Sequence, residues 1–232
     1  MTNLTNGLIW YIVFLLSTIF HEAAHAFTAM KMGDLTAYEN GQVSLSPVPH
    51  IKSEPIGTVV VPIISFLIGG WMLGWASAPY DRKWAHKYPK KSAAMAAAGP
   101  MSNFILVIIT ALLIHIGIYF NVLYAPEKIT IDSVVAAVNP GFYNGIAKIL
   151  SIMFSLNLIL FFFNLIPIPP LDGSGIVPMY LSNEAGRKYL HFVSNSAFAF
   201  IGIFIAWKLF DLIYFDLHTI FINLLYPGSN YR

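Results

Sequence analysis

Long apolar runs dominate the hydrophobic pattern of this chain. Three of them, residues 8–30, 93–120 and 149–171, are about as long as the 20 or so residues that a helix needs to cross a bilayer. The first contains a single Glu, and the other two contain no Asp, Glu, Lys or Arg. The pattern therefore predicts three membrane-spanning helices, and the third is expected to begin as early as Phe142.

Two further apolar stretches follow near the C-terminus. Residues 189–207 contain no Asp, Glu, Lys or Arg and predict a fourth span. Residues 209–226 are apolar but include Asp211, Asp216 and His218, which fits either a polar final span or a helix lying in the membrane interface.

The uninterrupted apolar run within residues 56–77 is too short for an ordinary membrane-spanning helix. An apolar run of 13 residues is followed by Gly69-Gly70 and a second apolar stretch. Thirteen helical residues reach about 20 Å, against a hydrocarbon core of about 30 Å. The glycine pair is a natural break, so we expect a re-entrant hairpin that the rest of the protein buries.

Residues 36–47 have some strand character, bounded by Asn40-Gly41 and Pro47. They predict either a small β-hairpin or an irregular interfacial loop. The expected fold is an all-α polytopic membrane protein with about five to six transmembrane or re-entrant helices. We expect one domain over residues 1–232, with a core at 8–180 and additional helices at 189–226.

Composition supports a membrane protein and excludes several other classes. Hydrophobic residues make up 57% of the chain and charged residues only 10%, whereas soluble domains carry about 25% charged residues. A soluble enzyme and a disordered chain are therefore excluded. A net charge of +2 provides no field for nucleic acid. The absence of cysteine excludes thiolate metal sites.

Basic residues predict the orientation in the membrane. Five of the 13 Lys and Arg residues lie within 82–91, which the positive-inside rule places in the cytoplasm. The helix over 93–120 then runs outward and the next helix returns, so Asp172 lies toward the cytoplasmic side. The N-terminus is expected outside, because the first span must also run inward for its C-terminal end to reach the depth of Asp172.

The first apolar run ends in His21-Glu22-Ala23-Ala24-His25. Residues four apart share one helix face, so both imidazoles can bind one Zn²⁺, and Glu22 can reach a water molecule on the metal. Random placement would produce this pattern about 0.005 times in a chain of this composition. The alternative is a helix end with two structural histidines hydrogen-bonded at the interface.

A catalytic zinc needs a third protein ligand, and Asp172 is the leading candidate. It follows prolines at 167, 169 and 170, which must end the preceding helix. Irregular backbone at membrane depth implies a cavity. The alternative is a proline-rich loop carrying a surface Asp.

These motifs resemble the site-2 protease family of intramembrane zinc metalloproteases. The resemblance rests on the HExxH pattern and on Asn164-x-x-Pro-x-x-Pro-Leu-Asp172-Gly. A third match is Gly99-Pro-x-x-Asn103. Gly33-Asp34, Pro55-Ile-Gly-Thr and Gly74-Trp-Ala are similar to the compact subgroup without PDZ or CBS domains. The resemblance covers about residues 8–180.

The resemblance implies a set of roles for individual residues. His21, His25 and Asp172 are expected to bind one zinc ion, Glu22 to be the catalytic carboxylate, and Asn164 to hold the substrate carbonyl or the oxyanion. Asn103 is expected to have a packing or backbone hydrogen-bonding role.

The expected function is hydrolysis of peptide bonds within or near transmembrane segments of protein substrates. Zinc-bound water activated by Glu22 is the expected nucleophile. The expected surroundings are lipid, in a cell membrane of prokaryotic type, with the active site toward the cytoplasm. Rival interpretations are a pseudoprotease, a metal transporter, and a protease with a large aqueous chamber for soluble peptides. An intact Glu22 and the lack of an internal repeat argue against the first two.

Overall fold

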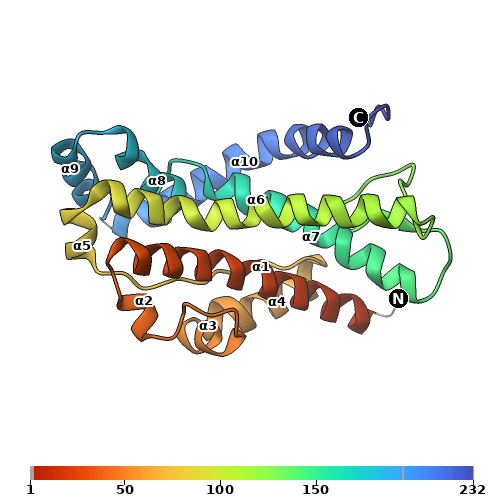
Figure 1. Ribbon diagram of the computed structural model, residues 1–232, viewed down its shortest axis with the longest axis horizontal. Coiled ribbons are helices and arrows are strands. Elements are labelled where there is room, and N and C mark those ends of the chain that lie inside the picture. The colour runs from red at the N-terminus through yellow and green to blue at the C-terminus, as the bar shows by residue number, and fades with distance from the viewer. Residues whose placement is uncertain (1–2, 195, 232) are drawn as a thin grey trace.

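Four long helices run alongside one another in the computed structural model, which describes residues 3–194 and 196–231 (Figure 1). They are α1 (Asn3–Met32), α6 (Pro89–Tyr119), α7 (Phe142–Asn164) and α10 (Ser196–Leu225). Within the described chain, α1, α6 and α7 are long and apolar enough to cross a bilayer. The three spans predicted from the hydrophobic pattern are therefore confirmed, including the start of the third at Phe142.

Proline has opposite effects in the two later spans. Pro100 lies inside α6 without ending it, whereas α7 ends at Asn164, before the prolines at 167, 169 and 170. A proline interrupts the helical hydrogen bonds and crowds the preceding turn, and a cluster leaves no way to continue. The segment that carries Asp172 is consequently released from the helix, as predicted.

The core lies in two layers between the long helices. One buried cluster joins α1 to α7 through Trp10, Phe14, Ile152 and Leu156. Another joins α6, α7 and α10, and includes Val107, Ile114, Phe154, Leu158 and Ile222. Both clusters include residues of α7, so the packing of this helix fixes the depth of the segment that follows it.

Residues 47–81 form a re-entrant hairpin. The short helix α3 (Pro47–Ser53) meets the helical stretch of η1 (Ile56–Val60) and α4 (Val61–Gly69) at 111°. Gly70, at φ +75°, ends α4 in the left-handed conformation that glycine adopts freely.

The chain then returns in an extended conformation beside the helix it has left. The amide of Trp75 donates to the carbonyl of Gly57 at 3.1 Å. At the base of the hairpin, Ser77 Oγ donates to Glu54 Oε1 at 2.7 Å. Both ends therefore lie together, as expected for a re-entrant segment.

Of the two structures predicted for residues 36–47, the β-hairpin is wrong. That segment begins with a helical turn, α2 (Thr36–Glu39), and contains no strand. Just before this turn, Asp34 Oδ1 accepts from the Thr36 amide at 3.0 Å. The sheet found in the described chain pairs β1 (Leu123–Tyr124) antiparallel with β2 (Ala136–Ala137), in the connection between α6 and α7.

The two predicted C-terminal segments, 189–207 and 209–226, are also corrected. The amphipathic α9 (Asn183–Val193) includes the start of the first, and α10 runs without interruption through residue 208. Buried residues recur every four positions along α10, whereas the charged residues occupy other faces. These positions are Gly202, Ala206, Phe210, Tyr214, His218 and Ile222, and Leu225 at the end of the helix is buried as well. Because this row of buried positions continues past residue 208, both predicted segments belong to one helix.

Short elements gather at the end of the bundle where α1 finishes. They are α5 (Arg82–Lys87), α8 (Asp172–Ile176), η2 (Val177–Tyr180) and α9 (Figure 1). Lys91 Nζ donates to the carbonyl of Met32 at 3.1 Å, which ties the start of α6 to the end of α1. The basic segment 82–91 and the HExxH end of α1 therefore lie on the same side.

Candidate metal centre

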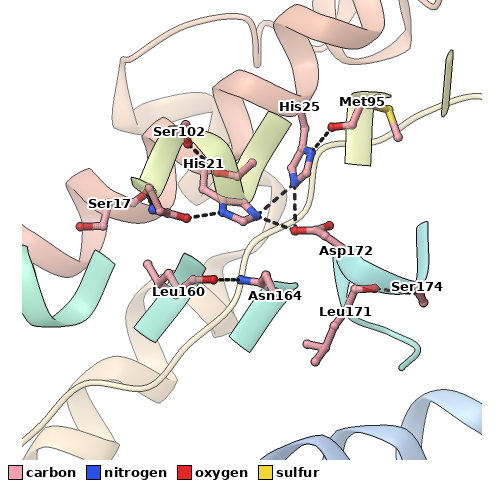
Figure 2. A network of polar contacts seen from close by, with 12 residues as sticks. Ser17, His21, His25, Met95, Ser102, Leu160, Asn164, Leu171, Asp172 and Ser174 are labelled. Atoms are coloured by element: carbon pink, nitrogen blue, oxygen red, sulfur yellow. Dashed lines mark hydrogen bonds and ion pairs between the residues drawn. The ribbon is translucent and has the colours of Figure 1, made fainter. Parts of the chain in front are cut away.

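Two imidazoles project from one face of α1, as the HExxH spacing predicts. His21 and His25 are both buried, and their Nε2 atoms lie 3.0 Å apart (Figure 2). Neither ring is free to turn away, because each Nδ1 is hydrogen-bonded on its far side. The two Nε2 atoms thus face a common point.

Asp172 completes this group although it lies 151 residues after His21. Its Oδ2 is 2.9 Å from His21 Nε2 and 3.3 Å from His25 Nε2. The three ligand-type atoms lie within 4.8 Å of one another, close enough to hold one metal ion. The structure therefore brings together the three ligands expected from the sequence.

The hydrogen bonds of His21 and His25 indicate which ring nitrogens carry a proton. His25 Nδ1 lies 2.8 Å from the carbonyl of Met95, which can only accept, and His21 Nδ1 lies 2.6 Å from Asn103 Oδ1. With both Nδ1 protons used there, the Nε2 lone pairs point at each other and at a carboxylate. Three acceptors directed at one point fit a bound cation, and a second partner on each far nitrogen is usual for metal-binding histidines.

Gly99 makes room for the two imidazoles. A Cβ atom at this position would lie 2.2 Å from His25 Nε2 and 2.5 Å from His21 Nε2. Only glycine leaves this space open. One turn further along α6, Asn103 reaches His21 with its side chain. The Gly-Pro-x-x-Asn segment thus supplies both space and a hydrogen-bond acceptor. Asn103 makes the expected backbone hydrogen bond, to the carbonyl of Ser17, and in addition contacts His21.

Glu22 lies on the wall of a cavity of about 410 Å³. It is buried, and His25 and Asp172 line the same cavity. Another wall is formed by the extended segment 76–80 (without Pro79) and by Leu190 and Val193 of α9. The other lining residues are Arg82, Ala85, His86, Ser92, Met95, Ala96, Pro169, Pro170, Leu171, Ser174, Gly175 and Ser194. A carboxylate, a metal-type cluster and a shared space therefore occur together.

The extended wall is anchored at its ends. Besides the Ser77–Glu54 contact, the amide of Asp81 donates to Asp34 Oδ2 at 2.8 Å. Asp34 is buried just after α1, so it links the end of the metal-binding helix to the end of the cavity wall. Sequence reasoning noted Asp34 only as part of a resemblance and gave it no role.

Asn164, expected to hold the substrate carbonyl, lies at the last turn of α7. Its Nδ2 donates to the carbonyl of Leu160 at 3.0 Å (Figure 2), and it is not among the residues that line the cavity. One of its two N–H groups is thus used by its own helix, and the other is available to a ligand.

Sequence reasoning missed residues that lie behind the metal centre. Met95 contributes a carbonyl, which no side-chain pattern can reveal. Asn157 and Ser17 lie one step further from His21 and contact Asn103. Their signal in the sequence was the presence of a polar side chain at the middle of an otherwise apolar span.

A bundle of membrane-spanning helices that holds a buried His, His and Asp group beside a glutamate defines an integral-membrane metalloprotein of protease type. The chain matches the model of peptidase family M50 over residues 9–209. It belongs to this family, the site-2 proteases, and zinc is its cofactor.

Named relatives agree with this assignment. A Bacillus subtilis protein named "Putative zinc metalloprotease YwhC" is 32% identical over 198 residues, which are 84% of this chain and 78% of the relative. "Putative zinc metalloprotease Rip2" of Mycolicibacterium smegmatis is 27% identical over 173 residues, 75% of this chain and 57% of the relative. The Rip2 protein of Mycobacterium tuberculosis strain H37Rv is 26% identical over 221 residues, 93% of this chain and 76% of the relative. No solved structure matches the chain.

Proposed function

We propose that this protein is an intramembrane endopeptidase that uses one zinc ion bound by His21, His25 and Asp172. The observation that carries the proposal is the convergence of their three acceptor atoms within 4.8 Å beside Glu22 in a shared cavity. A zinc site with three protein ligands leaves a position open for water or substrate, as catalytic sites require.

The chain's own residues would divide the chemistry between them. When bound, zinc lowers the pKa of water and polarises a carbonyl group. Glu22 accepts the proton from the attacking water and delivers it to the leaving amine. Asn164 donates the N–H group that Leu160 does not use to the substrate carbonyl as negative charge develops on its oxygen.

The proposed substrate is a transmembrane segment of another protein, locally unwound. A peptide bond inside an intact helix is shielded by its own hydrogen bonds, so the segment must extend before it is cut. The backbone amides of Ala76, Ser77, Ala78 and Tyr80 form no main-chain hydrogen bond with any described residue. This extended wall pairs with the substrate backbone in the proposed complex.

The proposed setting is the plasma membrane of a prokaryotic cell, with one catalytic domain whose cavity opens toward the cytoplasm. Support comes from the basic segment 82–91, which lies at the same end of the bundle as the cavity. Labelling of single cysteines, which the natural chain lacks, would test this. Residue 6 should react only from outside the cell and residue 90 only from inside, and a cytoplasmic residue 6 would contradict the orientation.

Replacement of Glu22 by Gln tests the catalytic proposal. Purified protein in detergent is incubated with a fluorogenic transmembrane peptide, and bound zinc is measured on the same samples. We expect cleavage to fall by at least about 100-fold, because proton transfer contributes 10²–10⁴, while zinc stays bound. Glu39→Gln, at an exposed position on α2, is the matched control and should cleave normally.

A Glu22→Gln protein that cleaves at the normal rate would end this proposal. Wild-type protein that binds zinc and cleaves no transmembrane peptide, but moves zinc across vesicle membranes, would favour the transporter interpretation instead.

A further inference from the structure

A row of buried polar side chains extends from the metal centre into the apolar bundle. His21 on α1 contacts Asn103 on α6, Asn103 contacts Asn157 on α7, and Asn157 returns to Ser17 on α1. Asn103, Asn157 and Ser17 are completely buried. Buried polar groups are costly unless they are hydrogen-bonded, and here each one has a partner.

We propose that Asn157 is a positioning residue of the zinc site, acting on His21 through Asn103. This inference rests on the zinc ligation proposed above, but not on peptidase activity. It assigns to the row of amides one task, which is to fix the position of a single proton on the His21 ring.

The orientation of Asn157 follows from a main-chain carbonyl. Its Nδ2 lies 2.8 Å from the oxygen of Met153, which can only accept. The same Nδ2 donates to Ser17 Oγ at 2.9 Å. With its nitrogen held in this way, Asn157 must present Oδ1 to α6.

The orientation of Asn103 follows in turn. Its Nδ2 donates to Asn157 Oδ1 at 2.8 Å and lies 3.3 Å from the carbonyl of Ser17, a second pure acceptor. Flipping this amide would place an oxygen against two oxygens. Asn103 must therefore present Oδ1, not Nδ2, to the imidazole of His21, 2.6 Å away.

The last step reaches the metal ligand. An amide oxygen at His21 Nδ1 requires a proton on Nδ1 and leaves the lone pair on Nε2, the atom that faces Asp172 and His25. Without Asn157, the amide of Asn103 loses the closer of the two acceptors that select its orientation and keeps only the carbonyl of Ser17, at 3.3 Å. In the flipped orientation it donates to Nδ1 and places the proton on Nε2, where zinc should bind.

The experiment compares zinc affinity by competition with a chromophoric chelator, supported by the visible spectrum of the cobalt-substituted protein. Asn157→Leu removes the acceptor and should weaken zinc binding by about 10- to 100-fold, the usual effect of a partner behind a ligand. Ser155→Ala is the matched control. Ser155 lies two residues away on α7, equally buried, and bonds to His218 rather than to the metal centre.

A double variant separates positioning from simple packing. Asp at position 103 offers oxygen on both sides, so its orientation toward His21 no longer depends on residue 157. Asn103→Asp combined with Asn157→Leu should therefore regain affinity to within a few-fold of wild type, with the wild-type cobalt spectrum. A packing defect would not be rescued in this way.

Unchanged affinity in Asn157→Leu, or a loss that equals that of Ser155→Ala, would overturn the proposal. So would a double variant no better than Asn157→Leu. If the Leu variant does not fold, Asn157→Ala, which removes the same acceptor without adding bulk, replaces it in both comparisons. None of these measurements depends on cleavage, so failure of the endopeptidase proposal would leave them interpretable.

Discussion

The two sides of the cavity are built in different ways. On the metal side, α1, α6 and α7 are joined by buried apolar clusters and by the amides behind His21. On the other side, α4 has Pro62 as its buried residue, and its Ile63, Ile64, Leu67 and Ile68 are exposed. The return from α4 packs Met72 into the α1–α7 cluster, but its later part is attached through separate hydrogen bonds from Trp75, Ser77 and Asp81.

This difference suits the two tasks of the site. Metal ligands must be held within a few tenths of an ångström, which a close-packed interior provides. A wall that admits a substrate segment must instead separate at low cost, and segments with few buried contacts open locally most easily. The following predictions test this division, beginning with the metal side.

Gly99→Ala should have the largest effect. The added methyl group would occupy space now held by the two Nε2 atoms, at 2.2 and 2.5 Å. Overpacking costs about 1–3 kcal/mol, and we expect zinc affinity and cleavage both to fall by more than about 100-fold, because the ligands themselves must move. Gly145→Ala, on α7 with no atom within 4 Å of the new Cβ, is the control. Normal zinc binding by Gly99→Ala would contradict the close approach of the two imidazoles to residue 99.

Gly57→Ala should displace the extended wall of the cavity and leave the group of His21, His25 and Asp172 unchanged. Its new Cβ would lie 2.3 Å from the carbonyl of Trp75, so the extended segment must shift away. We expect kcat/KM to fall by about 10- to 100-fold, as for other small displacements of substrate-positioning groups. Zinc content should equal that of wild type. A parallel loss of zinc would show that the two sides are not independent.

Asp34→Ala should loosen the far end of the same wall. It leaves the amides of Thr36 and Asp81 without their side-chain partner, at a cost of about 1–3 kcal/mol in unfolding free energy. We expect KM to rise with little change in zinc affinity. Thr36→Val removes the hydroxyl contact to Asp34 but keeps the Asp81 anchor, so it should retain a normal KM. Equal effects of both variants would reject Asp34 as an anchor of the wall.

Replacement of Asp132, in the connection between α6 and α7, should have the smallest effect, which is on the free energy of unfolding. Burial acts to raise the pKa of its carboxyl group, but hydrogen bonds from Lys148 and Thr130 outweigh it and lower the pKa. Because the folded pKa is below the unfolded value of about 3.9, the contribution to stability is present above that pH and is lost as pH falls through the folded pKa.

Thermal unfolding in detergent should therefore show a difference between wild type and Asp132→Asn of about 1 kcal/mol or less at pH 7. The difference should shrink below about pH 4. Glu184→Gln, which removes the exposed pair with Lys188, should have a smaller effect at pH 7. A difference that grows on acidification would contradict the assigned pair.

The sequence was sufficient where one segment carried its own signal. Uncharged runs predicted α1, α6 and α7, the spacing of His21 and His25 placed two imidazoles on one face, and the prolines after Asn164 predicted the release of Asp172. It misled where local propensity competed with tertiary contacts. Residues 36–47 had some strand character, but they begin with a helical turn, and Asp34 accepts from the Thr36 amide at its start. The charges of α10 suggested a break, although they lie off its buried stripe.

The sequence by itself determined that this is a membrane protein, which residues are candidates to bind a metal, and which helix carries two of them. Charge content and periodicity, from which these points follow, are local properties of the chain. Only the tertiary structure decided that Asp172 meets those imidazoles, that Gly99 leaves them room, and that hydrogen bonds join Asn157 to Asn103 and Asn103 to His21. Those relations join residues on different helices, and their geometry depends on how the helices pack. No pattern along a single segment records the distance between two atoms that the fold alone brings together.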